Sequence, residues 1–183
     1  MSTETANQTV PAGAWIADPV HSAIQFAVTH NGIATFRSGF KEFSATLTGG
    51  AQPKLEGAVD AASIDIGEPQ QKGHLLSPEF FDVDRVPQLK FESTDFTVEQ
   101  DGSVRFEGTL EIRGESRSVA GTGKYIHTDA ALTGGERIGL SLTAVVDRRD
   151  FGMNFQAPLP NGGNAVEWDV TITAELELAG PES

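Results

Sequence analysis

The stretch VEWDVTITAELEL, residues 166–178, alternates between apolar and polar side chains without a break. Its apolar members all have even numbers: Val166, Trp168, Val170, Ile172, Ala174, Leu176 and Leu178. Successive side chains of a β-strand point to opposite faces of the sheet, so this period of two places the apolar side chains together on one face. The stretch therefore predicts an antiparallel strand with one buried face and one face in water.

Similar alternation recurs along the chain. Together with residues 166–178, the candidate strands lie at 24–28, 43–47, 55–66, 89–99, 103–113, 117–127 and 137–147. Turns that contain glycine, such as Gln100-Asp101-Gly102 and Arg113-Gly114-Glu115, separate several of them and predict antiparallel connections. Eight strands are the number expected of a small closed barrel, whose interior holds either side chains or one ligand. The pattern alone leaves a filled barrel and a sandwich open as alternatives.

Two segments interrupt the strand pattern. In residues 67–86, the triplet Ser77-Pro78-Glu79 combines a capping residue, a proline for the first helical turn and an early acidic residue. We therefore expect one or two short helices there. In residues 153–164, Pro158 and Pro160 exclude a regular helix and a central strand, which predicts a long irregular loop.

Composition narrows the classes of protein. The chain has 183 residues, of which 38% are hydrophobic, and this predicts one domain. We place it at 14–180, after a flexible tail at 1–13. A formal charge of −13 disfavours nucleic acid and anionic membranes as partners. No apolar run reaches the roughly 20 residues of a membrane-spanning helix. The first residues lack the basic start and apolar middle of a secretory signal, which predicts a cytoplasmic protein.

The polar residues give little sign of catalysis or metal binding. The chain has no cysteine, and its histidines form no HxH or HExxH pair, so no metal site is predicted. It contains no nucleophile elbow or phosphate loop, so no catalytic residue is predicted either. Asp18 and His21 flank a proline turn, which favours a capping role. His30 and Arg149 are candidates for contact with a polar head group, and the alternative for Arg149 is an ion pair at a strand end.

Several short blocks, in their order and spacing, make residues 15–178 similar to the YceI-like family of lipid-binding barrels. The blocks are DPVHS (18–22), FAVTH (26–30) followed by Gly32, Gly39-Phe40 with Phe43-Ser44, HLLSPEFFD (74–82) followed by Pro87 and Phe91, LEIRG (110–114) and RDFGM (149–153). One departure is Ser118, at a position where the family often carries a proline before the next strand.

The resemblance implies an all-β fold, namely an extended, lipocalin-like antiparallel barrel of eight strands. It also implies non-catalytic binding, storage or transport of a polyisoprenoid, such as an isoprenoid quinone or polyprenyl phosphate, or of another long-chain amphiphile. No cofactor is implied beyond this lipid-like ligand. Many members of the family are periplasmic. A homodimer is compatible with this reading.

The expected ligand-binding residues are mostly aromatic, because 11 phenylalanines supply bulky apolar surface. Those expected on the barrel wall are Ile24, Phe26, Val28, Phe36, Phe40, Phe43, Phe91, Val170 and Ile172. Those expected at a mouth or lid are Phe80, Phe81, Phe151 and Phe155, with His30 and Arg149 as polar members. For each apolar residue, ordinary core packing is the alternative.

Two rival functions follow from the same residues. An enzyme acting on an apolar substrate would need Asp18, His21 or His30 to converge inside an apolar pocket and to titrate abnormally. An interaction module would have a barrel filled by its own side chains. The presence of a cavity, and the position of these polar groups relative to it, separates the three functions.

Overall fold

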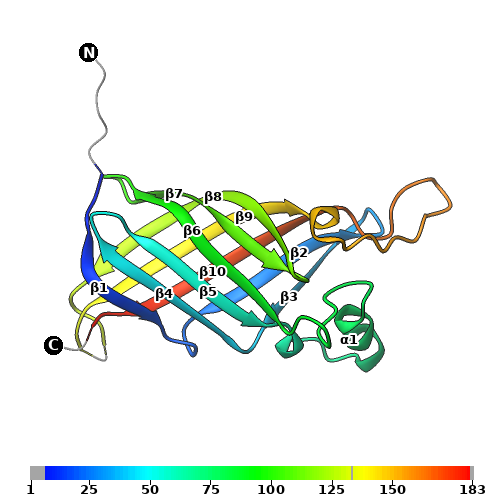
Figure 1. Ribbon diagram of the computed structural model, residues 1–183, viewed down its shortest axis with the longest axis horizontal. Helices are drawn as coiled ribbons and strands as arrows, with labels where there is room; N and C mark the ends of the chain where they lie inside the picture. The colour runs from blue at the N-terminus through cyan, green and yellow to red at the C-terminus, as the bar shows by residue number, and fades with distance from the viewer. Residues whose placement is uncertain (1–6, 133, 182–183) are drawn as a thin grey trace, which may run out of the picture.

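The computed structural model describes residues 7–132 and 134–181, and most of these residues belong to one antiparallel sheet (Figure 1). The strands are β1 (Val10–Ala17), β2 (Ala23–His30), β3 (Ala34–Phe40), β4 (Phe43–Gly50), β5 (Lys54–Asp60), β6 (Gln88–Val98), β7 (Ser103–Ile112), β8 (Glu115–Thr128), β9 (Arg137–Asp147) and β10 (Asp169–Ala179). The helices are α1 (Pro69–Leu76) and the 3-10 turns η1 (Ala61–Ser63) and η2 (Arg148–Phe151).

The sheet closes into a barrel because β1 and β10 pair with each other. Strand β10 pairs with β1 near its end, through Ala179 and Ile16, and with β2 further back, through Glu175 and Ala23. Strands β1 and β2 therefore act as two halves of one bent strand. Strands β3 and β4 do the same, since β3 pairs with β2 and β4 pairs with β1. Counted in this way the barrel has eight strands, which confirms the predicted fold class.

Eight of the strands overlap the predicted ranges, whereas β1 and β3 were not predicted. Strand β9 matches the predicted range of 137–147. Strand β5 ends at Asp60 and not at residue 66, because the Asp60 side chain accepts a hydrogen bond from the Ala62 amide and caps η1. Strand β1 begins at Val10, inside the predicted tail, while residues 1–6 of that tail lie outside the described residues.

The predicted helix start at Ser77 is wrong. Helix α1 begins at Pro69, and the Glu68 carboxylate caps it by accepting hydrogen bonds from the amides of Gln70 and Gln71 at 3.1 and 2.6 Å. Ser77 instead ends the helix, and its hydroxyl donates to the His74 carbonyl at 2.6 Å. Both sites combine a capping side chain with a following proline, so the local sequence signal could not distinguish them.

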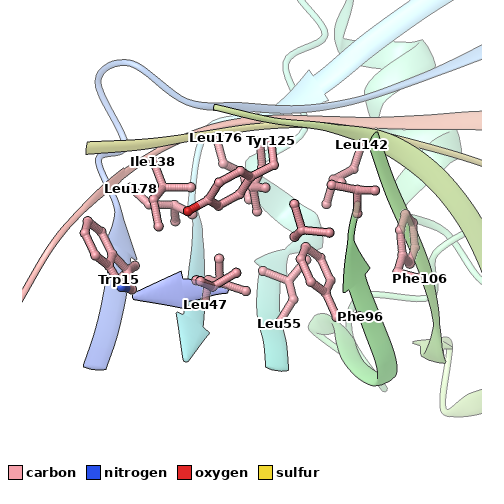
Figure 2. Packing of buried hydrophobic residues seen from close by; sticks show 14 of the residues in the cluster. Trp15, Leu47, Leu55, Phe96, Phe106, Tyr125, Ile138, Leu142, Leu176 and Leu178 are labelled. Carbon is pink, nitrogen blue, oxygen red and sulfur yellow. The ribbon is translucent and has the colours of Figure 1, made fainter. Parts of the chain in front are cut away.

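One end of the barrel is filled by side chains that we call the closed-end core (Figure 2). It comprises Val10, Trp15, Ala45, Leu47, Leu55, Phe96, Val98, Val104, Phe106, Tyr125, Ile138, Leu140, Leu142, Leu176 and Leu178. This end carries β1 (Figure 1). The Trp15 ring is fully buried and its Nε1 donates to the Pro11 carbonyl at 2.8 Å, so the indole N–H remains paired.

The opposite end carries a second apolar cluster beneath α1 and η2. Its buried members are Phe40, Val59, Ala61, Ile64, Phe80, Phe81, Ile112, Val146, Phe151 and Met153, and we call it the mouth cluster. At this end β5 stops at Asp60 and does not continue alongside β3. The chain after β5 contacts β3 through an isolated β-bridge between Ile64 and Phe40. Helix α1 and the chain up to β6 lie at this end of the barrel (Figure 1). None of the described helices is long and apolar enough to cross a membrane.

Candidate ligand-binding site

A cavity of about 690 Å³ lies inside the barrel between the closed-end core and the mouth cluster. Its volume falls within the range of about 300–1,000 Å³ that is typical of small-molecule sites. The exposed residues His30, Glu68, Gln70 and Gln71 lie on its wall and mark its opening beside α1. Most of the remaining wall is aliphatic or aromatic. The barrel is therefore not filled, contrary to the interaction-module alternative.

Strand alternation explains how the predicted residues reach the cavity. In β2, Ile24, Phe26, Val28 and His30 point inward, and Ile172 pairs in register with Phe26. The predicted residues on the wall are Ile24, Phe26, Val28, His30, Phe36, Phe40, Phe80, Phe81, Phe91, Phe151, Phe155, Val170 and Ile172. That these residues contact a ligand stays a prediction.

Two predicted ligand residues, Phe43 and Arg149, are not on the cavity wall. The Phe43 side chain is half-buried and packs against the mouth cluster. Arg149 faces the outside, where its Nε and Nη2 donate to the Asp147 carboxylate at 2.6 to 3.1 Å. This contact raises the pKa of Arg149 and lowers the pKa of Asp147. The alternative interpretation of Arg149, an ion pair at the end of β9, is therefore present in the structure, and its contact with a head group stays a prediction.

Trp168 also departs from the prediction, although its even number placed it with the inward side chains. Strand β10 begins at Asp169, so Trp168 precedes the regular ladder. Its side chain lies in an outer groove together with Asp169 and Thr171. The guanidinium carbons of Arg148 and Arg149 lie 4.4 and 4.7 Å from the indole centroid. Attraction between the exposed Arg149 cation and the ring favours the outward position of Trp168.

Phenylalanine rings from distant parts of the chain meet inside the cavity. The Phe26 ring centroid lies 6.1, 5.9 and 6.4 Å from those of Phe36, Phe40 and Phe81. Phe40 and Phe81 contact each other edge to face at 5.8 Å. These contacts join β2, β3 and the segment after α1 into one aromatic wall, and they hold Phe81 as part of the core.

A second aromatic group lies at the opening. The His74 ring contacts Phe80 and Phe155 edge to face, with centroids 5.0 and 4.6 Å apart, and Phe80 and Phe155 are 5.5 Å apart. His74 Nε2 also lies 2.5 Å from the Glu79 carboxylate. Helix α1 and the loop that carries Phe155 thus meet beside the cavity. We name His74, Phe80 and Phe155 the mouth trio.

Arg148 is a buried cation whose role the sequence did not reveal. Its Nε, Nη1 and Nη2 donate to the carbonyls of Glu167, Met153 and Val166 at 3.0, 2.7 and 2.9 Å. Burial lowers the pKa of Arg148. Because these carbonyls flank both ends of residues 154–165, one side chain fixes the base of the loop at the mouth.

Other cavity residues that were not among the candidates belong to strands with clear alternation. They are Leu55, Leu89, Phe106, Leu110, Ile112, Val119, Leu142, Val146 and Leu176. Their inward positions follow from the same period of two that identified β10. The alternation could therefore have found them once a cavity was assumed. His74 and Gln71 carried no such signal, because α1 has only a weak apolar face.

The polar groups of the enzyme alternative do not meet in the cavity. Asp18 and His21 lie at the bend before β2, whereas His30 lies at the far end of that strand. His21 Nδ1 is 2.8 Å from the Asp18 carboxylate, which raises the pKa of His21 and lowers that of Asp18. Asp18 Oδ1 also accepts from the Val20 amide, so the predicted capping role is present.

The Asp18–His21 pair is also where a metal could be held. Potential ligand atoms of Asp18, His21 and Glu177 lie within 4.8 Å of one another. Neither Asp18 nor His21 lies on the cavity wall. Glu177 already has a cationic neighbour, because Arg137 Nε lies 3.8 Å from its carboxylate. The hydrogen bonds of Asp18 and the ion pair of Glu177 explain why these side chains lie close together, and they stabilise the bend between β1 and β2.

Comparison with known proteins agrees with this geometry. The sequence model of the YceI-like domain family matches residues 15–178, which form almost the whole barrel. The chain belongs to the YceI-like family. Among its curated relatives, the UPF0312 protein of Photorhabdus laumondii is 28% identical over 159 residues, which cover 85% of this chain and 80% of that protein. A UPF0312 protein of Vibrio parahaemolyticus is 26% identical over 89% of each chain.

Solved structures share the fold of this YceI-like protein. BcnA of Burkholderia cenocepacia superposes with a TM-score of 0.74 at 18% identity, covering 89% of this chain and 99% of that one. A polyisoprenoid binding domain from Saccharophagus degradans gives a TM-score of 0.71 at 12% identity, covering 93% and 100%. At these identities the likeness concerns the fold alone.

Proposed function

We propose that this YceI-like protein binds, stores or transports a polyisoprenoid or a similar long-chain amphiphile without catalysing a reaction on it. The observation that carries the proposal is the apolar cavity of about 690 Å³, which is closed at one end by the closed-end core. The polyisoprenoid binding domain with the same fold supports the choice of ligand class. An isoprenoid quinone and a polyprenyl phosphate are two ligands of this class.

The distribution of polar groups orients the ligand. Gln70, Gln71, His74 and His30 lie at the opening, whereas Phe26, Val170 and Ile172 line the interior. Burial of a hydrocarbon tail is favourable by about 25 cal/mol for each Å² removed from water, so affinity requires no charged contact. The tail therefore lies inside the barrel and the head group lies beside α1.

Mass spectrometry of organic extracts from freshly purified protein tests the proposal. We expect a long-chain lipid in near-stoichiometric amount, and none in the extract of an unrelated protein purified alongside. The protein stripped of lipid should then bind added farnesol or a similar prenyl alcohol in titration calorimetry. Extracts without lipid, together with no binding of added prenyl alcohol, would refute the proposed function.

The mouth trio and the aromatic wall predict different effects for two phenylalanines. Phe155→Ala removes a contact between the loop and α1, so we expect several-fold faster ligand release with little loss of stability. Phe81→Ala removes a ring from the core and should lower the free energy of unfolding by about 3 kcal/mol, the lower end of the range for buried phenylalanines, because Phe81 also borders the cavity. Stopped-flow displacement of a fluorescent lipid and urea unfolding measure the two effects. Equal release rates in wild type and Phe155→Ala would place the exit path elsewhere.

A further inference from the structure

The inner end of the cavity is made by residues that also belong to the closed-end core. These shared residues are Ala45, Leu55, Phe106, Leu142 and Leu176, and each is at most 7% exposed. In Figure 2, Phe106 and Leu142 lie at one side of the core and Trp15 lies at the other. The core behind them includes Leu140 and Ile138, which are 1% and 0% exposed. A ligand tail that enters from the mouth therefore ends against packed side chains.

Two glycines of β8 leave the space that two of these side chains, Phe106 and Leu142, occupy. A Cβ atom at Gly121 would lie 2.4 Å from the Phe106 ring, and one at Gly123 would lie 2.8 Å from a Leu142 methyl group. The Phe106 ring and the Leu142 side chain thus pack directly against the backbone at Gly121 and Gly123. Phe106 also contacts Phe91 edge to face at 5.9 Å, which restricts its ring from the side of β6.

We propose that Phe106 and Leu142 form a fixed floor that sets the longest hydrocarbon tail this protein can hold in full. This inference rests on the proposed function and adds a rule of selection to it. Tails that stop short of the floor leave apolar surface unfilled. Longer tails must leave their excess length at the mouth, in contact with water.

The floor acts as a limit because the core behind it cannot yield without loss of packing. Protein interiors are packed as densely as organic crystals, so displacing Phe106 would force overpacking among its neighbours. The wall next to Phe106 has small residues at the same level: Phe106 of β7 pairs with Gly121 of β8, and Gly121 pairs with Ala144 of β9. The small side chain of Ala144 leaves space in the cavity for the ligand. A larger side chain at position 144 would therefore shorten the cavity.

Competition by primary alcohols of increasing length, from octanol to eicosanol, against a fluorescent lipid tests the floor. In the wild type, affinity should rise about fourfold for each added methylene, which corresponds to about 0.8 kcal/mol, up to a limiting length. Beyond that length the affinity should stay constant. Continued increase up to eicosanol would contradict the floor while leaving the binding function intact.

Three variants locate the limit. Phe106→Leu should move the limiting length to longer alcohols, and Ala144→Leu should move it to shorter ones. Phe96→Leu is the matched control, because Phe96 belongs to the closed-end core but not to the cavity wall. It should lower stability without moving the limit. A limit unchanged in both Phe106→Leu and Ala144→Leu would overturn the inference, whereas no binding of any alcohol would overturn the proposed function itself.

Discussion

Ile172→Asp is expected to lower the free energy of unfolding by about 4 kcal/mol, whereas Thr171→Asp should change it by less than about 0.5 kcal/mol. The two positions are adjacent in β10 but face opposite sides of the sheet. Ile172 lies on the cavity wall and pairs with Ala144 and Phe26. Thr171 lies in the outer groove that also holds Arg37 and Arg149, where a carboxylate remains hydrated and near positive charge.

The loss in Ile172→Asp should depend on pH. An apolar wall raises the pKa of the introduced carboxyl group above its value of about 3.9 in the unfolded chain. A raised pKa means that the folded state holds the proton more tightly, so the loss is smallest below about pH 4. The loss grows as the pH rises through the folded-state pKa. Urea unfolding of both variants and the wild type at low and neutral pH measures this difference. Equal stability of the two variants at neutral pH would contradict the inward orientation of Ile172.

The barrel could be predicted from the sequence wherever one strand face is buried along its whole length. Val170, Ile172, Leu176 and Leu178 follow a period of two because β10 is paired on both sides. Prediction failed where the ladder ends. Trp168 has an even number like the inward residues, but it lies before the first pair of β10, and its ring lies in the outer groove beside Arg149. Parity constrains a side chain only within a paired strand.

Many apolar residues of the cavity wall and the polar residue His30 could be predicted from the sequence, whereas the roles of the two neighbouring arginines could not. Inward residues such as Phe26 and Phe91 follow from alternation. In contrast, Arg148 and Arg149 are neighbours of the same type, and only the tertiary structure decides which one is buried. Arg149 is held outside by Asp147, and Arg148 is held inside by backbone carbonyls. His74 was missed because its partner Phe155 lies far away in sequence.

The position of Arg148 predicts a large effect for its removal. Arg148→Met keeps an extended apolar side chain but removes the hydrogen bonds to the carbonyls of Met153 and Glu167. The Val166 carbonyl loses one of its two donors and keeps the Gln156 side-chain amide. An unpaired buried acceptor costs about 1 to 3 kcal/mol, and partial access of water lowers the sum. We therefore expect a loss of about 4 kcal/mol in the free energy of unfolding.

Arg149→Met is the matched control for Arg148→Met. Arg149 is exposed, and its pair with Asp147 is a surface ion pair, which contributes at most about 1 kcal/mol. Urea unfolding compares the two variants, and hydrogen exchange of residues 154–165 reports on the loop. Since Arg148 joins both ends of this loop, exchange there should accelerate in Arg148→Met and stay unchanged in Arg149→Met. A similar stability of the two variants would show that Arg148 is dispensable for the structure at the mouth of the cavity. The loop would then be held by its other contacts, such as the hydrogen bond that the Gln156 side chain donates to the Val166 carbonyl.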